Sequence, residues 1–329
     1  MPAQKTSDPS ESDSSGRASS HQISDIDLNL MTRKFIFLIN PVSGTASKKL
    51  LPELIAAAAK KYRAHYEILP TVESGDYHFV KQKIREEKFT DVIICGGDGS
   101  VNTVVQDVKE TGVNFGIVPL GSGNGLALSA KIPKPSAKAL DVVFTGKPSF
   151  IDGFLINQSF ACMLCGLGFD AQVAHDFAKQ KKRGLLTYAQ QSLKNFFAAK
   201  PLSFEIDLGE TNFTTEAYFI SIANSNQFGN QVTIAPSASL SDGLLDIVIV
   251  RKMNKAQLPL SLIDQIAGRN AVEDPQHLKK SGIIYLQADK LSIKNIDNAP
   301  LHVDGEPRET AKHFNIRVIP DCFKLIQPE

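Results

Sequence analysis

The first half of the chain alternates between short apolar runs and segments whose apolar residues recur at helical spacing. The runs predict buried strands at 34–40, 65–69, 92–95 and 114–119. The spaced segments predict helices at about 46–63, 73–88 and 136–144, and one that begins after residue 99. Strands joined by helix-length crossovers predict an α/β first domain, with a parallel sheet covered by helices on both faces.

The second half has a different pattern, in which strands follow one another at short intervals. Its apolar runs predict strands at 149–156, 159–165, 202–208, 213–223, 243–250, 290–293, 301–303 and 314–319. Two segments keep helical spacing, at about 171–199 and 255–267. Clustered strands joined by short turns predict a second, β-rich domain built as an antiparallel sandwich or barrel.

The change of pattern places the domain boundary near residues 146–150. We therefore expect an α/β domain over 33–148 and a β-rich domain over 149–319. Residues 1–32 are rich in serine and charged residues and lack the apolar stretch of a signal peptide, which predicts a disordered leader.

The composition of the chain limits the classes of protein to consider. At 329 residues and 42% hydrophobic, it is long enough for two domains with cores of their own. Its net charge of +1 gives no electrostatic reason to expect a nucleic acid partner. No apolar run approaches the roughly 18 residues that cross a bilayer. Four cysteines suit a reducing compartment better than a disulfide framework, so we expect a cytoplasmic protein. Cys162 and Cys165 have CxxC spacing within an apolar run, which favours buried thiols over a metal site.

Two glycine-rich turns follow buried strands of the first half and precede helical patterns. The first turn contains Gly96, Gly97, Asp98, Gly99 and Ser100, and the second contains Gly121, Ser122, Gly123 and Asn124. Asn40 and Thr71 lie at the ends of the two other predicted strands. In a parallel sheet all four strand ends meet at one edge, where ligands bind. Glycine lets the backbone approach a phosphate, and the N-terminus of a helix offers free N–H groups to an anion. Taken alone, each turn also fits an ordinary connection between a strand and a helix.

Carboxylates occur at three turns where they could do chemistry. Asp98 is unusual among amides that would bind phosphate, because it would repel the ligand unless a metal ion or a proton-donating substrate lies between them. Asp304 and Glu306 flank a glycine after an apolar strand, and two adjacent acids can divide metal binding and proton transfer between them. Asp242 lies at a tight turn with free backbone carbonyls, a set that suits a hard cation such as Mg²⁺. Ordinary acidic surface turns are the alternative for the last two.

A basic run at 179–183 lies near the end of one helical pattern. A solvated helix face is the favoured interpretation of this run. Contact of Lys181 and Arg183 with phosphate, on a nucleotide or at an anionic membrane surface, is the alternative.

Read in order, four motifs resemble those of the diacylglycerol kinase catalytic family, which includes bacterial soluble lipid kinases and the sphingosine and ceramide kinases. They are GGDG at 96–99, PLGSGN at 119–124, SDGLLD at 241–246 and VDGE at 303–306. GGDG alone also occurs in NAD kinases and phosphofructokinases, whereas the four together are specific. The resemblance covers about residues 34–327.

The resemblance implies a lipid kinase that binds ATP in the cleft between its two domains. It assigns Asn40, Thr71 and the two glycine turns to the nucleotide, and Asp242 with the carbonyls of Ser239 and Leu244 to a structural Mg²⁺. Asp304 and Glu306 would lie at the γ-phosphate, one as general base and the other near the catalytic Mg²⁺. Asp98 is a third candidate for the base. The last strand, within about 320–329, would return to the first domain.

The resemblance also bears on the lipid. Bacterial diacylglycerol kinases usually have an acid after the asparagine of the second turn, where this chain has Gly125. Sphingosine kinases have a small residue there, so the sequence favours a sphingoid base or another lipid alcohol over diacylglycerol. Asp170 is a candidate for binding the lipid head group. A lipid substrate implies peripheral contact with a membrane, and a homodimer is left open.

Three alternatives are weighed against a lipid kinase. An NAD kinase would share Asp98, but its adenine- and ribose-binding motifs should follow soon after GGDG, and the GLGF run at 166–169 comes too late. A phosphofructokinase would need an acidic proton-acceptor motif that is missing downstream of the glycine turn. A non-catalytic lipid or nucleotide sensor would have no reason to keep Asp98, Asp304 and Glu306.

Overall fold

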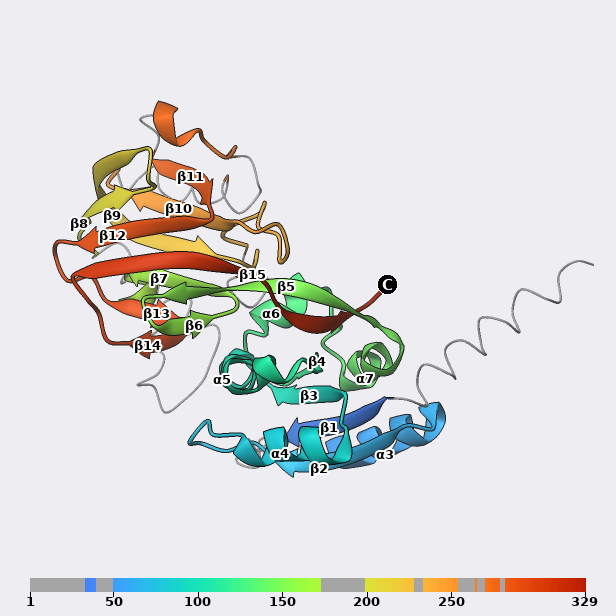
Figure 1. Cartoon of the computed structure of the whole chain (residues 1–329). Helices are drawn as coiled ribbons and strands as arrows, with labels where there is room; N and C mark the ends of the chain where they lie inside the picture. The colour runs from blue at the N-terminus through green and yellow to red at the C-terminus, as the bar shows by residue number, and fades with distance from the viewer. Residues whose placement is uncertain are drawn as a thin grey trace, which may run out of the picture.

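The first half of the chain forms the predicted alternation of strands and helices (Figure 1). The computed structural model describes residues 33–39, 50–172, 199–227, 233–253, 264, 270–278 and 282–329. The elements of this half are β1 (Lys34–Ile39), α3 (Leu51–Tyr62), β2 (His65–Pro70), α4 (His78–Glu87), β3 (Asp91–Gly96), α5 (Asp98–Val108), the short η1 (Lys109–Thr111), β4 (Asn114–Pro119), α6 (Gly125–Ser129) and α7 (Ser136–Thr145).

Strands β1 to β4 form a parallel sheet in the order β2-β1-β3-β4. The chain moves from β1 to β2 in one direction across the sheet, and from β2 through β3 to β4 in the other. Right-handed crossovers therefore place α3 on one face and α4 and α5 on the opposite face. This reversal lies between β1 and β3, and ligands of such sheets bind at the carboxyl ends of the strands beside it. The predicted parallel sheet, covered on both faces, is confirmed.

Helices α3 and α5 form because their apolar residues lie on one face each. Leu51, Ile55 and Ala59 of α3 are buried, and α5 buries Val101 and Val105 with their apolar neighbours at the same spacing. Helix α4 begins at His78, five residues later than the sequence predicts. The N–H of Tyr77 donates to Asp107 Oδ2 of α5 (2.8 Å), and this long-range contact fixes the start of α4.

The second half is built from largely antiparallel strands, as the sequence predicts. They are β5 (Lys147–Ile156), β6 (Ser159–Ala161), β7 (Leu164–Gly168), β8 (Leu202–Asp207), β9 (Asn212–Ala223), β10 (Leu245–Arg251), β11 (Ile283–Ala288), β12 (Lys290–Asn295), β13 (Leu301–Val303), β14 (Glu306–Arg308) and β15 (His313–Gln327); a short helix, η2, covers Pro275–His277. Strands β11 and β14 are absent from the prediction. The helical patterns predicted at 171–199 and 255–267 lie almost wholly outside the described residues.

One predicted strand, 159–165, is divided into β6 and β7. The break falls at Cys162 and Met163, whose backbone N–H groups point to the carboxylate of Asp304 instead of a neighbouring strand. The division is therefore caused by a side chain about 140 residues further along the chain.

Strand β15 connects the two halves of the molecule. Its first part pairs with β12 and β5, and after a bulge between Ile319 and Phe323 its last part lies parallel to β4, with Lys324 opposite Asn114. The end of the chain thus returns to the first sheet, as the resemblance implies. Figure 1 shows β5 and β15 running together from the β-rich half towards α6 and α7. All strands that the described residues form are joined in one hydrogen-bonded network.

The apolar core has two parts. One surrounds the parallel sheet and extends to one face of the β-rich half, and the other fills the interior between β8, β12, β15 and their neighbours. Among the described helices, none has the length and apolar character needed to span a membrane.

Candidate active site

The two predicted glycine turns are in direct contact. They follow the neighbouring strands β3 and β4, where Gly96 pairs with Pro119 and the N–H of Leu120 donates to Gly96 O (2.9 Å). A Cβ on Gly97 would lie 3.0 Å from Gly121 Cα, closer than ordinary van der Waals contact. The turns therefore need glycine for their own packing, before any ligand is considered.

Asp98 begins α5 and faces the start of α6. The backbone N–H groups of Gly125, Leu126 and Asn124 act on its carboxylate as hydrogen-bond donors. These bonds answer the question of how an acid is tolerated beside amides that suit an anion. Burial nevertheless dominates and raises the pKa of Asp98, and the nearby charge of Asp304 adds to the increase.

Asn124 shapes the second turn from within. It has a left-handed backbone (φ 56°), its Oδ1 accepts from the N–H of Gly121 and its Nδ2 donates to Gly121 O, both at 2.8 Å. Its side chain is thus engaged inside the turn. Ser122, two residues earlier, is exposed.

Asp304 and Gly305 form the two-residue loop of the hairpin between β13 and β14, in which Val303 pairs with Glu306. Both loop residues have positive φ (48° and 81°), as the type I′ turn of a tight hairpin requires. The Asp304 carboxylate is buried and saturated with donors. Its Oδ1 accepts from the N–H groups of Met163 and Leu164, and its Oδ2 accepts from the N–H of Cys162, all at 3.0 Å.

The hairpin loop with Asp304 and Glu306, called the acidic hairpin below, contacts the first glycine turn through α5. Asn102, one helical turn after Asp98, donates from Nδ2 to Asp304 Oδ2 at 2.7 Å. Glu306 lies over Gly99, since a Cβ on that glycine would be 3.2 Å from Glu306 Oε1. Glu306 is exposed, whereas Asp304 is buried. The three predicted catalytic carboxylates, Asp98, Asp304 and Glu306, are thus gathered around the start of α5.

The turn predicted to hold a cation lies at the start of β10. Asp242 is exposed, and its Oδ1 accepts from the N–H of Leu244 (3.1 Å), while the N–H of Ser241 approaches Ser239 Oγ (3.4 Å). Asp152 of β5 holds this turn in place by hydrogen bonds. Asp152 Oδ2 accepts from the N–H of Gly243 (2.8 Å) and its Oδ1 accepts from the N–H of Asp321 in the β15 bulge (2.9 Å).

Asp246, the last residue of the same motif, is fully buried. Its Oδ1 accepts from Tyr285 OH (2.6 Å) and Gln287 Nε2 (3.2 Å), whereas Oδ2 has no hydrogen-bond partner. Burial raises the pKa of Asp246 to about 6. A buried carboxylate oxygen without a donor is uncommon and calls for a cation or water beside it. Among the described residues, no three His, Cys, Asp or Glu side chains form a group that could hold a metal ion.

Asp170, the predicted head-group residue, is buried beside His302 of β13. Its Oδ2 lies 3.4 Å from His302 Nε2, and its Oδ1 accepts from the N–H of Ala171 (2.7 Å). Gly166 leaves the space that both side chains fill. Burial raises the pKa of Asp170, and the contact with His302 opposes the increase.

Other predicted site residues are placed less closely. The N–H of Thr71 donates to Ile39 O (3.0 Å), so Thr71 lies beside the end of β1. Asn40, Lys181 and Arg183 lie outside the described residues. Cys162 and Cys165 are buried and free, and burial raises the pKa of both thiols.

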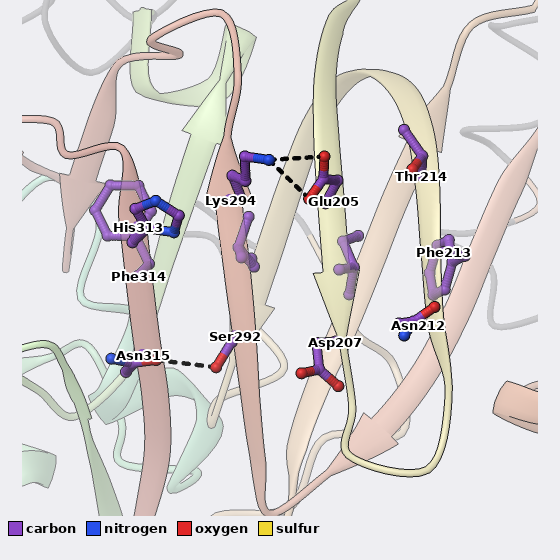
Figure 2. A pocket seen from close by; sticks show the side chains of 12 residues that line it. Glu205, Asp207, Asn212, Phe213, Thr214, Ser292, Lys294, His313, Phe314 and Asn315 are labelled. Atoms are coloured by element: carbon purple, nitrogen blue, oxygen red, sulfur yellow. Dashed lines mark hydrogen bonds and ion pairs between the residues drawn. The ribbon is translucent and has the colours of Figure 1, made fainter.

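A shallow concavity of about 500 Å³ lies elsewhere, over β8, β9, β12 and β15 (Figure 2). Two cross-strand pairs in it are Lys294 with Glu205 (2.9 and 3.0 Å) and Ser292 with Asn315 (2.9 Å). Such pairs are the usual interactions on the solvent face of a sheet. None of the predicted site residues lines it.

Sequence reasoning missed two residues that organise the site, Asn102 and Asp152. Asn102 carries a signal, because its position four residues after Asp98 puts both on one face of a helix. Asp152 carries none, since its partners at Gly243 and Asp321 are about 90 and 170 residues away.

Comparison with known proteins agrees with this fold. Residues 34–155 match the diacylglycerol kinase catalytic domain, and residues 164–327 match the YegS C-terminal NAD kinase beta sandwich-like domain. A diacylglycerol kinase of Staphylococcus carnosus is 26% identical over 84% of this chain and 89% of its own length. A Chromohalobacter salexigens protein named as a probable YegS-like lipid kinase is 28% identical over 85% and 90%.

A solved structure has the same fold. The crystal structure of a Bacillus anthracis diacylglycerol kinase superposes with a TM-score of 0.68, at 18% identity, over 90% of this chain and 97% of that one. Since the two domain models account for both halves of the molecule, the chain belongs to the diacylglycerol kinase catalytic family of lipid kinases.

Proposed function

We propose that this protein is an ATP-dependent lipid kinase, which transfers the γ-phosphoryl group of ATP to the hydroxyl of a sphingoid base, diacylglycerol or related lipid. One observation carries the proposal. The acidic hairpin at Asp304–Glu306 meets the first glycine turn at Asn102 and Gly99, so an anion-binding turn and carboxylates from the other half of the chain share one site.

The nucleotide phosphates belong at the edge formed by the ends of β1, β2, β3 and β4. Asn40 and Thr71 follow the first two of these strands in the sequence. The two glycine turns contact each other there, and glycine at Gly97, Gly99 and Gly121 keeps side chains out of the way. In phosphoryl transfer the protein mainly positions the reactants and offsets charge, which suits such a backbone-rich site.

The three acids have different roles in this proposal. Asp304 is surrounded by donors, so it shapes the site. Glu306 is exposed, and burial raises the pKa of Asp98. These two carboxylates are therefore the ones available to accept a proton. The lipid hydroxyl oxygen attacks the γ-phosphorus while its proton passes to one of them. The bond from that phosphorus to the bridging oxygen breaks, and ADP leaves with the electron pair.

Mg²⁺ fits the turn around Asp242. The proposed donors are hard oxygen atoms, from the Asp242 carboxylate and the carbonyls of Ser239 and Leu244, and Mg²⁺ usually completes such a set with water. The partnerless Oδ2 of Asp246 nearby also favours a cation or its bound water. When bound, Mg²⁺ would supply positive charge that offsets the charge of the phosphates.

Gly125 supports a sphingoid base or another lipid alcohol over diacylglycerol. A Cβ on this residue would lie 3.0 Å from Gln227 O and 3.4 Å from Met163 Sδ. An acidic side chain, as bacterial diacylglycerol kinases carry, would have to displace a backbone carbonyl. Asp170, with Lys181 and Arg183, is the proposed contact for the lipid head group or membrane surface. We also propose a cytoplasmic protein that meets its substrate by peripheral contact with the membrane, with a homodimer as its candidate assembly.

The test is to incubate the protein with labelled ATP, Mg²⁺ and, in turn, diacylglycerol, sphingosine, ceramide and NAD. We expect label in a lipid extract, most strongly with sphingosine, and its loss in Glu306→Gln. Label in NAD would instead indicate an NAD kinase. ATP binding without any labelled product would indicate a non-catalytic sensor.

A further inference from the structure

Asn102 is a buried polar side chain that joins the two parts of the site. It is 6% exposed and makes two hydrogen bonds from the same amide nitrogen, to Asp304 Oδ2 (2.7 Å) and to Phe160 O (3.1 Å). Both partners belong to the β-rich half, whereas Asn102 belongs to α5, the helix that Asp98 begins. Among the described residues in the first half of the chain, Asn102 alone donates a side-chain hydrogen bond to Asp304.

We infer that Asn102 is a positioning residue for the reaction, which sets the acidic hairpin against the first turn of α5. The inference rests on the proposed kinase function and deepens it. Asp98 and Asn102 lie on one face of α5, and Asp304 and Glu306 lie on one tight hairpin. The hydrogen bond between Asn102 and Asp304 therefore fixes the distance between the two proton acceptors, Asp98 and Glu306, across the site.

The amide of Asn102 suits this role because it donates without adding charge. Asp304 already receives three backbone N–H groups, so the Asn102 amide completes its set of donors. A leucine here would remove one donor from a buried carboxylate. An aspartate would place two carboxylates within hydrogen-bond distance, which raises the pKa of one of them.

Other titratable groups lie near residue 102 and Asp304. The Cys162 thiol lies 3.5 Å from Asp304 Oδ2, and the pKa of this thiol is raised far out of the neutral range by burial. Asp98 is close enough to feel the charge of Asp304. His302, on the same hairpin, faces Asp170 instead. A new ionisation introduced at residue 102 should therefore be recognisable in the pH profile.

The experiment compares Asn102→Asp and Asn102→Leu with wild type, by kcat for lipid phosphorylation between pH 5 and 9 at saturating ATP. The carboxyl group that Asn102→Asp introduces can donate to Asp304 while it is protonated, as the amide does, and loses this ability when it ionises. We expect Asn102→Asp to lose roughly tenfold in kcat or more at pH 8, about one lost hydrogen bond, and to recover much of it towards pH 5. Asn102→Leu should be low throughout, and the KM for ATP should change little in both.

Asn114→Asp is the matched control. Asn114 Nδ2 donates to the buried Asp91 at 3.0 Å, so an amide–carboxylate hydrogen bond is altered here too, at the opposite edge of the sheet and beside Arg33. Its kcat profile should keep the wild-type shape, while its thermal stability depends on pH.

Two results overturn the inference. One is a kcat profile of Asn102→Asp with the wild-type shape, and the other is wild-type kcat in folded Asn102→Leu. If wild type itself phosphorylates no lipid, the proposed function fails separately. The Asn102–Asp304 link is then judged by melting temperature, which should rise towards low pH relative to wild type in Asn102→Asp and not in Asn102→Leu; without that difference the link is refuted as well.

Discussion

Gly97 and Gly121 touch through their backbones, and a Cβ on Gly121 would lie 2.5 Å from Gly97 Cα. The two turns, which follow different strands, therefore pack directly against each other, and this close packing is possible because neither glycine has a side chain. The two glycines therefore have a packing role that does not depend on which ligand the turns bind. The sequence predicts that the two turns lie at the same edge of the sheet, but not that these two glycines are in contact.

Gly121→Ala should therefore destabilise the fold as well as the site. The added methyl meets backbone that cannot rotate away, and overpacking of this kind costs about 1–3 kcal/mol. Chemical denaturation would measure the loss. Gly209→Ala is the control, because Gly209 has positive φ but open space around it, so that only backbone strain of about 1 kcal/mol is expected, with activity kept. Equal loss of activity in both variants would contradict the packing argument.

Asp304→Asn and Glu306→Gln should separate a structural acid from a reactive one. An amide nitrogen at residue 304 would face backbone N–H groups, and leaving buried donors unpaired costs about 1–3 kcal/mol. Glu306 is exposed, so Glu306→Gln should keep wild-type stability while kcat falls. Melting temperature and kcat measured on both variants check this. Wild-type turnover in both would show that neither acid takes part in the reaction.

Asp98→Asn should lower activity and remove one pH-dependent contribution to stability. Burial raises the pKa of Asp98 in the folded protein above its unfolded value, so between the two values the folded state holds more protons. The free energy of unfolding of wild type should then fall as the pH rises from about 4 through the folded pKa. The variant lacks this loss, so its free energy of unfolding should rise relative to that of wild type as the pH increases. Chemical denaturation of both proteins without metal ions, at several pH values, measures this difference in the free energy of unfolding. A difference that does not change with pH would refute the predicted direction.

The sequence was sufficient for the architecture because each half has a strong local pattern. Largely apolar runs such as β1 and β4 could be recognised as buried parallel strands, and β4 begins and ends where predicted. Strand β14 was not recognisable, since its three residues include Pro307 and are mostly exposed. The start of α4 depends on Asp107, and the break between β6 and β7 on Asp304. Both are set by residues distant in the sequence.

The candidate site could be predicted as a set of turns, but not as a set of contacts. The carboxyl ends of neighbouring strands in a parallel sheet lie at one edge, so the sequence predicts that the glycine turns lie close together. Nothing in the residues around Asp304 reveals that its carboxylate accepts from three consecutive N–H groups at Cys162, Met163 and Leu164. The difference between Asp304 and Glu306 is one of burial, and burial is decided by tertiary packing.

Lys294→Ala should leave lipid phosphorylation unchanged. Lys294 pairs with Glu205 across two strands in the concavity of Figure 2, and both side chains are about half exposed. An exposed ion pair contributes about 0–1 kcal/mol, so a small fall in stability is the most that should appear. Turnover with the preferred lipid is the measurement. A marked loss of kcat in a folded variant would mean that this face takes part in function.

Asp242→Asn should abolish the stabilisation of the protein by Mg²⁺. A ligand that binds only the folded state raises the free energy of unfolding, by about 2.7 kcal/mol at a hundredfold excess over its Kd. The carboxylate of Asp242 is the charged member of the proposed donor set, so the variant should melt at the same temperature with and without Mg²⁺. Asp207→Asn is the matched control, since Asp207 also accepts from an N–H two residues on, that of Gly209 (2.8 Å), at a turn remote from the site. It should keep the wild-type response to Mg²⁺. An undiminished response in Asp242→Asn would place the cation elsewhere, with the acidic hairpin at Asp304 and Glu306 as the next location to examine.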